Sequence, residues 1–290
     1  MDEGARGVEM TTREIVVDGI RLHVTEAGEG PVLVLLHGLS GTHQNWELTI
    51  PAFADRWRVV ALDLPGHGRS AKPDAPYTID FYAGVVRSLG RALGIDEAVV
   101  IGNSLGGQIA VEIGLAYPAW ARALVLVAPA GGFALPLRAL APVIGAAAAP
   151  GLLRYALPRS LARCFYHRGA PGYETRQRLL AERLAHADYP DFARAVARSL
   201  AGALGAGDQP IGRLTQPTLL VWGQDDRLVP LSASRRLLRD VPQARLAVFQ
   251  RCGHLPMLEQ ASQFNHVVGE FLRAVEAAPL SPARQASGGG

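Results

Sequence analysis

The sequence predicts an α/β fold built on a mostly parallel, doubly wound β-sheet. Short apolar runs alternate with helical segments along most of the 290 residues, which is the pattern of strands joined by crossover helices. Several of these runs are apolar without interruption, as expected of strands that are buried on both faces. Hydrophobic residues make up 49% of the chain and charged residues only 19%, which is enough apolar material for a large buried core.

The elements can be placed in order along the chain. The segment 14–24 predicts a β-hairpin, because Asp18-Gly19 is a strong two-residue turn signal between two apolar-rich runs. The following apolar runs predict strands, and the stretches with helical periodicity predict helices that begin or end near capping residues and prolines. We expect strands at 32–36, 57–63, 98–102, 123–128, 217–223 and 245–249, and helices at 79–93, 105–116 and 260–276.

A helical insertion divides the predicted sheet. Residues 131–211 contain no strand pattern and are rich in Ala, Leu, Arg and Pro, so we expect a helical cap over a core formed by residues 1–130 and 212–290, with flexible ends. Apolar residues of the cap either line a substrate pocket or pack the cap onto the core, and its arginines either hold a substrate carboxylate or lie in solvent. The apolar candidates are Phe133, Leu135, Leu137, Leu140, Leu152 and Leu153, and the basic ones are Arg138, Arg154 and Arg163.

Charge and cysteine content argue against several classes of protein. The net charge is +3, and the 29 basic residues, of which Lys72 is the single lysine, form no block that would predict nucleic-acid binding. Two cysteines outside any Cys/His cluster predict free thiols and no structural metal. No signal peptide and no apolar run of membrane-spanning length is present. We therefore expect a cytoplasmic protein without a membrane span, whose oligomeric state the sequence leaves open.

The strongest chemical signal is the segment GNSLGG at 102–107. It follows a predicted buried strand and opens a predicted helix, which is the setting of a nucleophile elbow with Ser104 as nucleophile. The turn is so tight that the neighbours two residues away on each side must be very small, and these are Gly102 and Gly106. Ser104 would then lie at a helix N-terminus, where free N–H groups favour developing negative charge.

Two further segments supply the partners that a serine nucleophile needs. Asp225 and Asp226 follow the predicted strand 217–223, where a carboxylate can orient a histidine. His254 comes later in the chain, on a loop between the last predicted strand and the last predicted helix. The order Ser, Asp, His along the chain differs from that of two other triad folds.

Two glycine-containing turns belong to the same predicted edge of the sheet. The segment 37–41 follows strand 32–36, and we expect the backbone N–H of Leu39 to pair with that of Leu105 as an oxyanion hole. The segment 63–70 is interpreted as a structural turn at the pocket wall rather than a nucleotide-binding loop, because prolines break any helix directly after it. His37 and His23 are interpreted as structural.

With these motifs in order, the chain resembles the α/β-hydrolase fold family with an inserted helical cap, over roughly residues 14–130 and 211–276. The family pattern G-x-x-D-x-x-x-P, matched by Gly223 and Pro230, selects Asp226 over Asp225 as the acid. The resemblance implies a catalytic triad of Ser104, Asp226 and His254 and no cofactor.

The nucleophile narrows the reaction, because relatives that open epoxides or remove halides use an aspartate at the elbow. Hydrolysis of a small, apolar carboxylic ester through an acyl-enzyme is the leading expectation. The alternative is a carbon–carbon hydrolase of meta-ring-fission products, which the chain resembles at residues 102–104. Such enzymes usually have a Gly-Pro-Gly-like oxyanion loop and a Trp after the catalytic histidine. In this chain the loop at 37–46 reads HGLSGTHQNW, and Leu255 follows His254. Lactonase, thioesterase, acyltransferase and a triad-bearing small-ligand receptor remain open.

Overall fold

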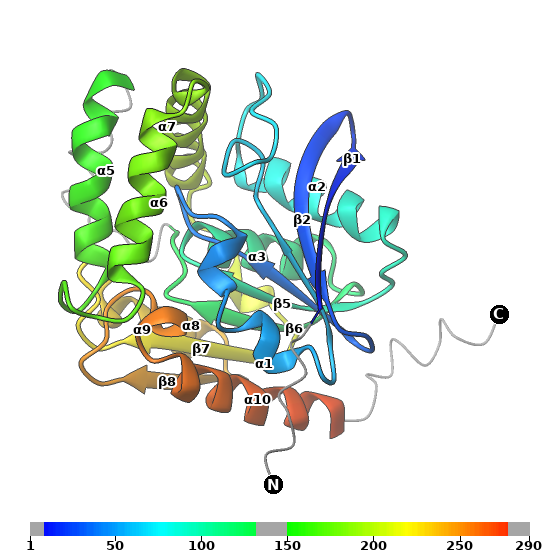
Figure 1. The fold of residues 1–290 in the computed structure, drawn as a ribbon. Helices are drawn as coiled ribbons and strands as arrows, with labels where there is room; N and C mark the ends of the chain where they lie inside the picture. The colour runs from blue at the N-terminus through cyan, green and yellow to red at the C-terminus, as the bar shows by residue number, and fades with distance from the viewer. Residues whose placement is uncertain (1–8, 132–149, 278–290) are drawn as a thin grey trace, which may run out of the picture.

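The structure, a computed structural model, describes residues 9–131 and 150–277. Its centre is an eight-stranded sheet in the order β1-β2-β4-β3-β5-β6-β7-β8 (Figure 1). The pairs β1·β2 and β2·β4 are antiparallel, and every other neighbouring pair is parallel. The strands are Met10–Val17, Ile20–Ala27, Val32–Leu36, Arg58–Leu62, Ala98–Asn103, Ala121–Val127, Thr218–Gly223 and Ala244–Phe249, for β1 to β8.

The helices follow the predicted order, with short additions at the loops. The hairpin turn is confirmed, since Val17 pairs with Ile20 and both Asp18 and Gly19 have positive φ, as a type I′ turn requires. The helices are η1 (His43–Trp46), α1 (Ile50–Phe53), α2 (Ile79–Ala92), α3 (Leu105–Ala116), α5 (Pro150–Cys164), α6 (Tyr173–Ala185), α7 (Tyr189–Gly205), η2 (Ile211–Arg213), η3 (Leu231–Ala233), α8 (Ser234–Asp240), α9 (Pro256–Glu259) and α10 (Ala261–Ala277).

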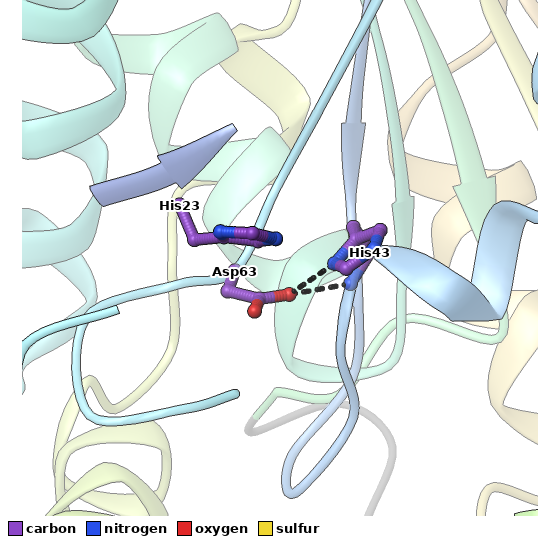
Figure 2. A group of neighbouring side chains, drawn as sticks. All are labelled: His23, His43 and Asp63. Carbon is purple, nitrogen blue, oxygen red and sulfur yellow. Dashed lines mark hydrogen bonds and ion pairs between the residues drawn. The ribbon is translucent and has the colours of Figure 1, made fainter. Parts of the chain in front are cut away.

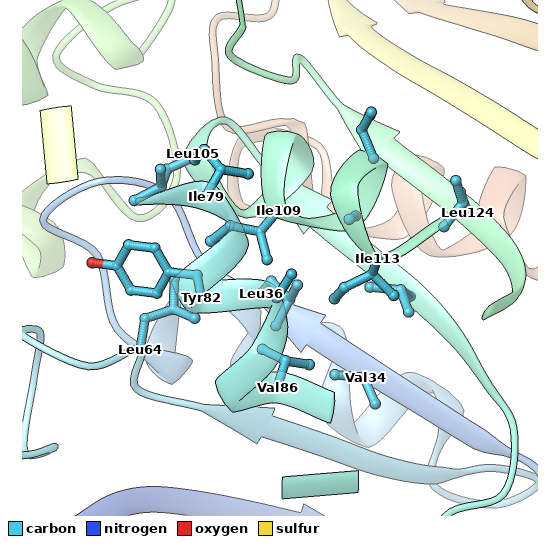
Figure 3. Close-up of a cluster of buried hydrophobic side chains, with 14 of the residues drawn as sticks. Val34, Leu36, Leu64, Ile79, Tyr82, Val86, Leu105, Ile109, Ile113 and Leu124 are labelled. Atoms are coloured by element: carbon cyan, nitrogen blue, oxygen red, sulfur yellow. The ribbon is translucent and has the colours of Figure 1, made fainter. Parts of the chain in front are cut away.

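Both faces of the sheet are buried, which explains the uninterrupted apolar strands. Along β3, Val34 and Leu36 belong to one core cluster and Leu33 and Leu35 to another, because successive side chains of a strand point to opposite faces. On the first face α2 and α3 cover the sheet, and Figure 3 shows their side chains meeting Val34 and Leu36. On the second face α1, α9 and α10 contribute the covering residues.

The described part of the insertion forms a third packed unit. Helices α5, α6 and α7 stand together at one end of the sheet (Figure 1), and their facing residues form a small apolar cluster of their own. Leu153 is part of that cluster, whereas Leu152 is 53% exposed. The other predicted apolar candidates, Phe133, Leu135, Leu137 and Leu140, lie outside the described residues, as does Arg138. Among the described helices, none combines the length and the apolar character needed to cross a membrane.

Candidate active site

Ser104 lies in the turn between β5 and α3, at the N-cap position of the helix, with φ 55° and ψ −115°. A Cβ atom at Gly102 would lie 2.1 Å from the carbonyl oxygen of Gly106, and one at Gly106 would lie 2.2 Å from that of Leu36. Side chains at these two positions are therefore excluded by backbone atoms, which cannot move away. Ser104 is not a glycine, so its positive φ is strained, and the close packing of the turn holds it in this conformation.

His254 and Asp226 form the second part of the site. The Nδ1 atom of His254 lies 2.6 Å from Oδ2 of Asp226, and both side chains are almost fully buried. The other Asp226 oxygen accepts the backbone N–H groups of Leu228 (2.8 Å) and Val229 (2.9 Å), which fixes the carboxylate in the turn after β7. Within the described residues Nε2 of His254 has no hydrogen-bond partner. It is Asp226, and not Asp225, that contacts the histidine.

A buried carboxylate holds the loop that carries His254, and sequence reasoning missed it. Glu259 accepts the N–H of Gly253 (3.0 Å) on one oxygen and that of Tyr166 (2.7 Å) on the other. Burial raises the pKa of Glu259, and the backbone donors oppose that shift. Because Tyr166 lies two residues after the end of α5, Glu259 ties the His254 loop to the base of the inserted helices.

The predicted oxyanion segment lies beside Ser104. A Cβ at Gly38 would lie 3.1 Å from the Ser104 Cβ atom, so glycine lets the segment approach Ser104 without crowding. Leu39 and Leu105 both border the pocket that also contains Ser104 and His254. His37 holds the segment: its Nδ1 lies 2.7 Å from the Gly38 carbonyl oxygen, and its Nε2 accepts the Leu64 N–H (3.0 Å). The interpretation of His37 as structural agrees with these contacts.

These groups open into a pocket of about 480 Å³ between the sheet edge and the inserted helices. Its wall is largely apolar, which suits an organic substrate. The apolar lining includes Leu39, Leu105, Leu157, Leu161, Phe192, Leu200, Val229 and Leu255.

Two arginines of α6 also line this pocket, and sequence reasoning did not select them. Arg176 donates to the Gln44 carbonyl oxygen and pairs with Glu47, whereas Arg183 pairs with Asp188. Among the described residues, no hydrogen-bond acceptor meets the buried Nε of either. Their seven-residue spacing places them on one helix face, but this spacing gives no sign in the sequence that the face meets a pocket.

The predicted carboxylate-binding arginines of α5 lie elsewhere. Arg154 stacks on the ring of Tyr189, 4.3 Å from its centroid, and neither it nor Arg163 lines the pocket.

The fold and the sequence together define the class of protein. The family model of the α/β-hydrolase fold matches residues 31–261, so the chain belongs to this family, and it is a hydrolase of that fold.

Individual members of the family are similar to the chain over most of its length. The chain is 32% identical over 285 residues to 2-hydroxymuconate semialdehyde hydrolase of Pseudomonas sp. (strain CF600), covering 93% of this chain and 96% of the relative. It superposes with a TM-score of 0.79 and 27% identity on 2-hydroxy-6-oxo-6-phenylhexa-2,4-dienoate hydrolase from Rhodococcus sp. strain RHA1, covering 92% and 99% of the two chains. A membrane phospholipase A described as a bacterial virulence factor matches with a TM-score of 0.80 and 26% identity, covering 93% and 87%.

Proposed function

We propose that this protein hydrolyses a carbon–carbon bond in a ring-fission product of the 2-hydroxy-6-oxodienoate type. The relatives support this alternative better than the leading expectation of ester hydrolysis, because they are named as hydrolases of 2-hydroxymuconate semialdehyde and of 2-hydroxy-6-oxodienoates. The observation that carries the proposal is the presence of two largely buried arginines, Arg176 and Arg183, in the same pocket as Ser104 and His254. A dienoate carries a carboxylate that guanidinium groups bind well, whereas a neutral ester has no such group.

In the proposed reaction, the dienol first transfers its hydroxyl proton to C5 and becomes a 2,6-diketo acid. Oγ of Ser104 then attacks the C6 carbonyl while Nε2 of His254 takes its proton. The C5–C6 bond breaks, and its electron pair moves through the C3–C4 double bond to the 2-keto oxygen, which takes up the proton from His254. Water then hydrolyses the acyl-serine, so the products are a carboxylic acid and a 2-hydroxydienoate.

The neighbouring groups have separate roles in this scheme. Asp226 holds His254 in the tautomer whose Nε2 is free and stabilises the imidazolium that forms. The backbone N–H groups of Leu39 and Leu105 hold the oxyanion at C6, where each such donor contributes about 10²–10³ in rate. Arg176 and Arg183 bind the carboxylate end, toward which negative charge moves as the bond breaks.

We assign residues 131–211 the role of a cap over this pocket. Leu157 and Leu161 of α5 and Phe192 of α7 line the same pocket as Ser104, and the three described helices have their own apolar cluster. Where related carbon–carbon hydrolases usually have a Trp after the histidine, Leu255 borders this pocket. The smaller side chain favours a bulkier group on C6 of the substrate.

The test compares two reactions of the same purified protein. We would measure kcat/KM for 2-hydroxymuconate semialdehyde and 2-hydroxy-6-oxo-6-phenylhexa-2,4-dienoate, following the loss of their absorbance, and for p-nitrophenyl butyrate. We expect the dienoates to be preferred, and Ser104→Ala to lose turnover of every substrate by several orders of magnitude.

The variant Arg183→Gln separates the proposed substrate class from a general hydrolase. Loss of a charge-assisted hydrogen bond of about 1.5–3 kcal/mol predicts a 10–150-fold lower kcat/KM for the dienoates, with little change for the ester. Arg178→Gln, on the same helix but with a side chain that is 70% exposed, is the control and should behave as wild type. A protein that turns over the ester and neither dienoate would be an ester hydrolase instead.

A further inference from the structure

Outside the proposed active site, three residues from separate elements meet between the sheet and the loop that follows β3. His23 lies on β2, His43 begins η1, and Asp63 directly follows β4. One ring nitrogen of each histidine and one Asp63 oxygen all lie within 4.8 Å of one another. Figure 2 shows the His23 ring above the Asp63 carboxyl group, with its far nitrogen directed toward His43. The two rings are 5.0 Å apart between centroids.

Hydrogen bonding within the protein accounts for two of these residues and leaves the third unexplained. Asp63 Oδ1 accepts both the backbone N–H of His43 and its ring Nδ1–H, each at 2.8 Å, and Oδ2 accepts the N–H of Arg69 at 2.8 Å. His23 is only 5% exposed, yet no protein atom among the described residues meets its Nε2. A buried polar atom without a partner is costly, so this nitrogen points to a ligand.

We propose that His23, His43 and Asp63 form a binding site for one divalent transition-metal ion of the Zn²⁺ type. Two imidazoles and one carboxylate are a donor set that such ions favour. Binding needs no net ionisation of the histidines: the ion replaces the proton between His43 Nδ1 and Asp63, and that proton moves to Nε2 of the same ring. The His43 side chain is 18% exposed, so water can complete the coordination.

The electrostatic surroundings suit a cation bound to neutral imidazoles. Asp63 is buried, yet its two oxygens accept hydrogen bonds from the backbone N–H groups of His43 and Arg69, contacts that favour a carboxylate. Among the described residues no hydrogen-bond partner meets Nε2 of His23, so this nitrogen can offer its lone pair to a metal. Glu14 and Arg69 also act on His23, one of each sign, which leaves Asp63 as the net local charge.

The site differs from the expectation drawn from the cysteines, which predicted no structural metal. Its donors are 20 or more residues apart and lie on three elements, so no local spacing signals it. A bound ion would connect β2 and β4 to the segment after β3, whose residues Thr42, Gln44 and Asn45 line the pocket. The ion would therefore stabilise one wall of the proposed active site without touching the substrate.

The test uses tag-free, chelator-treated full-length protein titrated with ZnCl₂ against a chromophoric chelator. We expect one ion per chain, and a rise in Tm on the order of 5 °C at a hundredfold excess over Kd. His23→Gln and His43→Gln should each weaken Zn²⁺ binding by at least about 10–100-fold. Losses of this size already follow when a residue that only hydrogen-bonds a metal ligand is changed. With Co²⁺ as the probe, wild type should develop d–d absorption bands that both variants lack.

The control is His266→Gln, because His266 is exposed and pairs with Glu270 on the same helix. It should bind Zn²⁺ as wild type does. The metal-free Tm of each variant shows whether it is folded, so a loss of binding can be interpreted. Wild type without stoichiometric binding, or His23→Gln with undiminished affinity, would overturn the proposal and leave a buried water as the partner of His23.

Discussion

The pH dependence of stability tests how the loop beside Ser104 is held. His37 and His67 are both fully buried, and burial lowers the pKa of His37 to about 4 and that of His67 to about 3. His37 has to be neutral for a geometric reason as well, since its Nε2 accepts the N–H of Leu64. A proton on that nitrogen would place two donors against each other.

The direction of the effect follows from these pKa values. In the unfolded chain the two histidines have the ordinary pKa of about 6.5. Below this pH they bind protons in the unfolded chain but not in the folded chain, so the free energy of unfolding falls as the pH falls toward 4. From pH 7 to pH 5 each of the two histidines lowers the free energy of unfolding by about 2 kcal/mol, or about 4 kcal/mol together. Urea unfolding with a chelator present, at both pH values, measures this difference.

A variant assigns the effect to one residue. In His37→Gln the side-chain oxygen can still accept the Leu64 N–H, but it does not titrate, so the difference between pH 7 and pH 5 should shrink by about 2 kcal/mol. His266→Gln removes an exposed histidine and should leave the difference unchanged. Equal pH dependence in wild type and His37→Gln would refute the reasoning.

Three further predictions concern other parts of the molecule. Gly102→Ala should cost more than about 3 kcal/mol in urea unfolding, because its Cβ would meet a carbonyl oxygen at 2.1 Å; Gly84→Ala, in open space on a helix, should be neutral or stabilising, and a similar cost for both would contradict the steric argument. Asp226→Asn should lower kcat about 10³–10⁴-fold with the fold intact, and a small effect in steady-state assays would remove Asp226 from the mechanism. Burial raises the pKa of the Cys252 thiol, so this thiol should react with a disulfide reagent about 100-fold more slowly in the native protein than in urea; rapid native labelling of Cys252 would show that it is accessible.

The secondary-structure elements and their order could be predicted from local sequence patterns. The Asp18-Gly19 turn, the apolar strand at 32–36 and the glycines around Ser104 each carry a physical requirement that a few neighbouring residues express. A tight turn needs positive φ, a strand buried on both faces needs uninterrupted apolar residues, and the elbow has no room for side chains. The same reasoning placed Asp226 and His254 at the ends of strands, where the structure joins them at 2.6 Å.

The choice between ester and carbon–carbon hydrolysis could not be predicted from local sequence patterns. It depends on which side chains of the inserted helices reach the pocket, and the arginines first considered, Arg154 and Arg163, do not. Arg176 and Arg183 do, because the packing of α6 against the loops of the sheet turns one helix face inward. A charged residue has the same local pattern whether its helix face meets solvent or a cavity.

The sequence by itself determined the fold class, the order of its elements and the residue types expected at the reactive end of the pocket, because each rests on contacts between near neighbours in the chain. Tertiary structure alone decided the charged lining of the pocket, the fastening of the His254 loop by Glu259 and the meeting of His23, His43 and Asp63. Each of these depends on side chains from distant segments, whose distances are set by how the helices pack on the sheet and not by any local spacing.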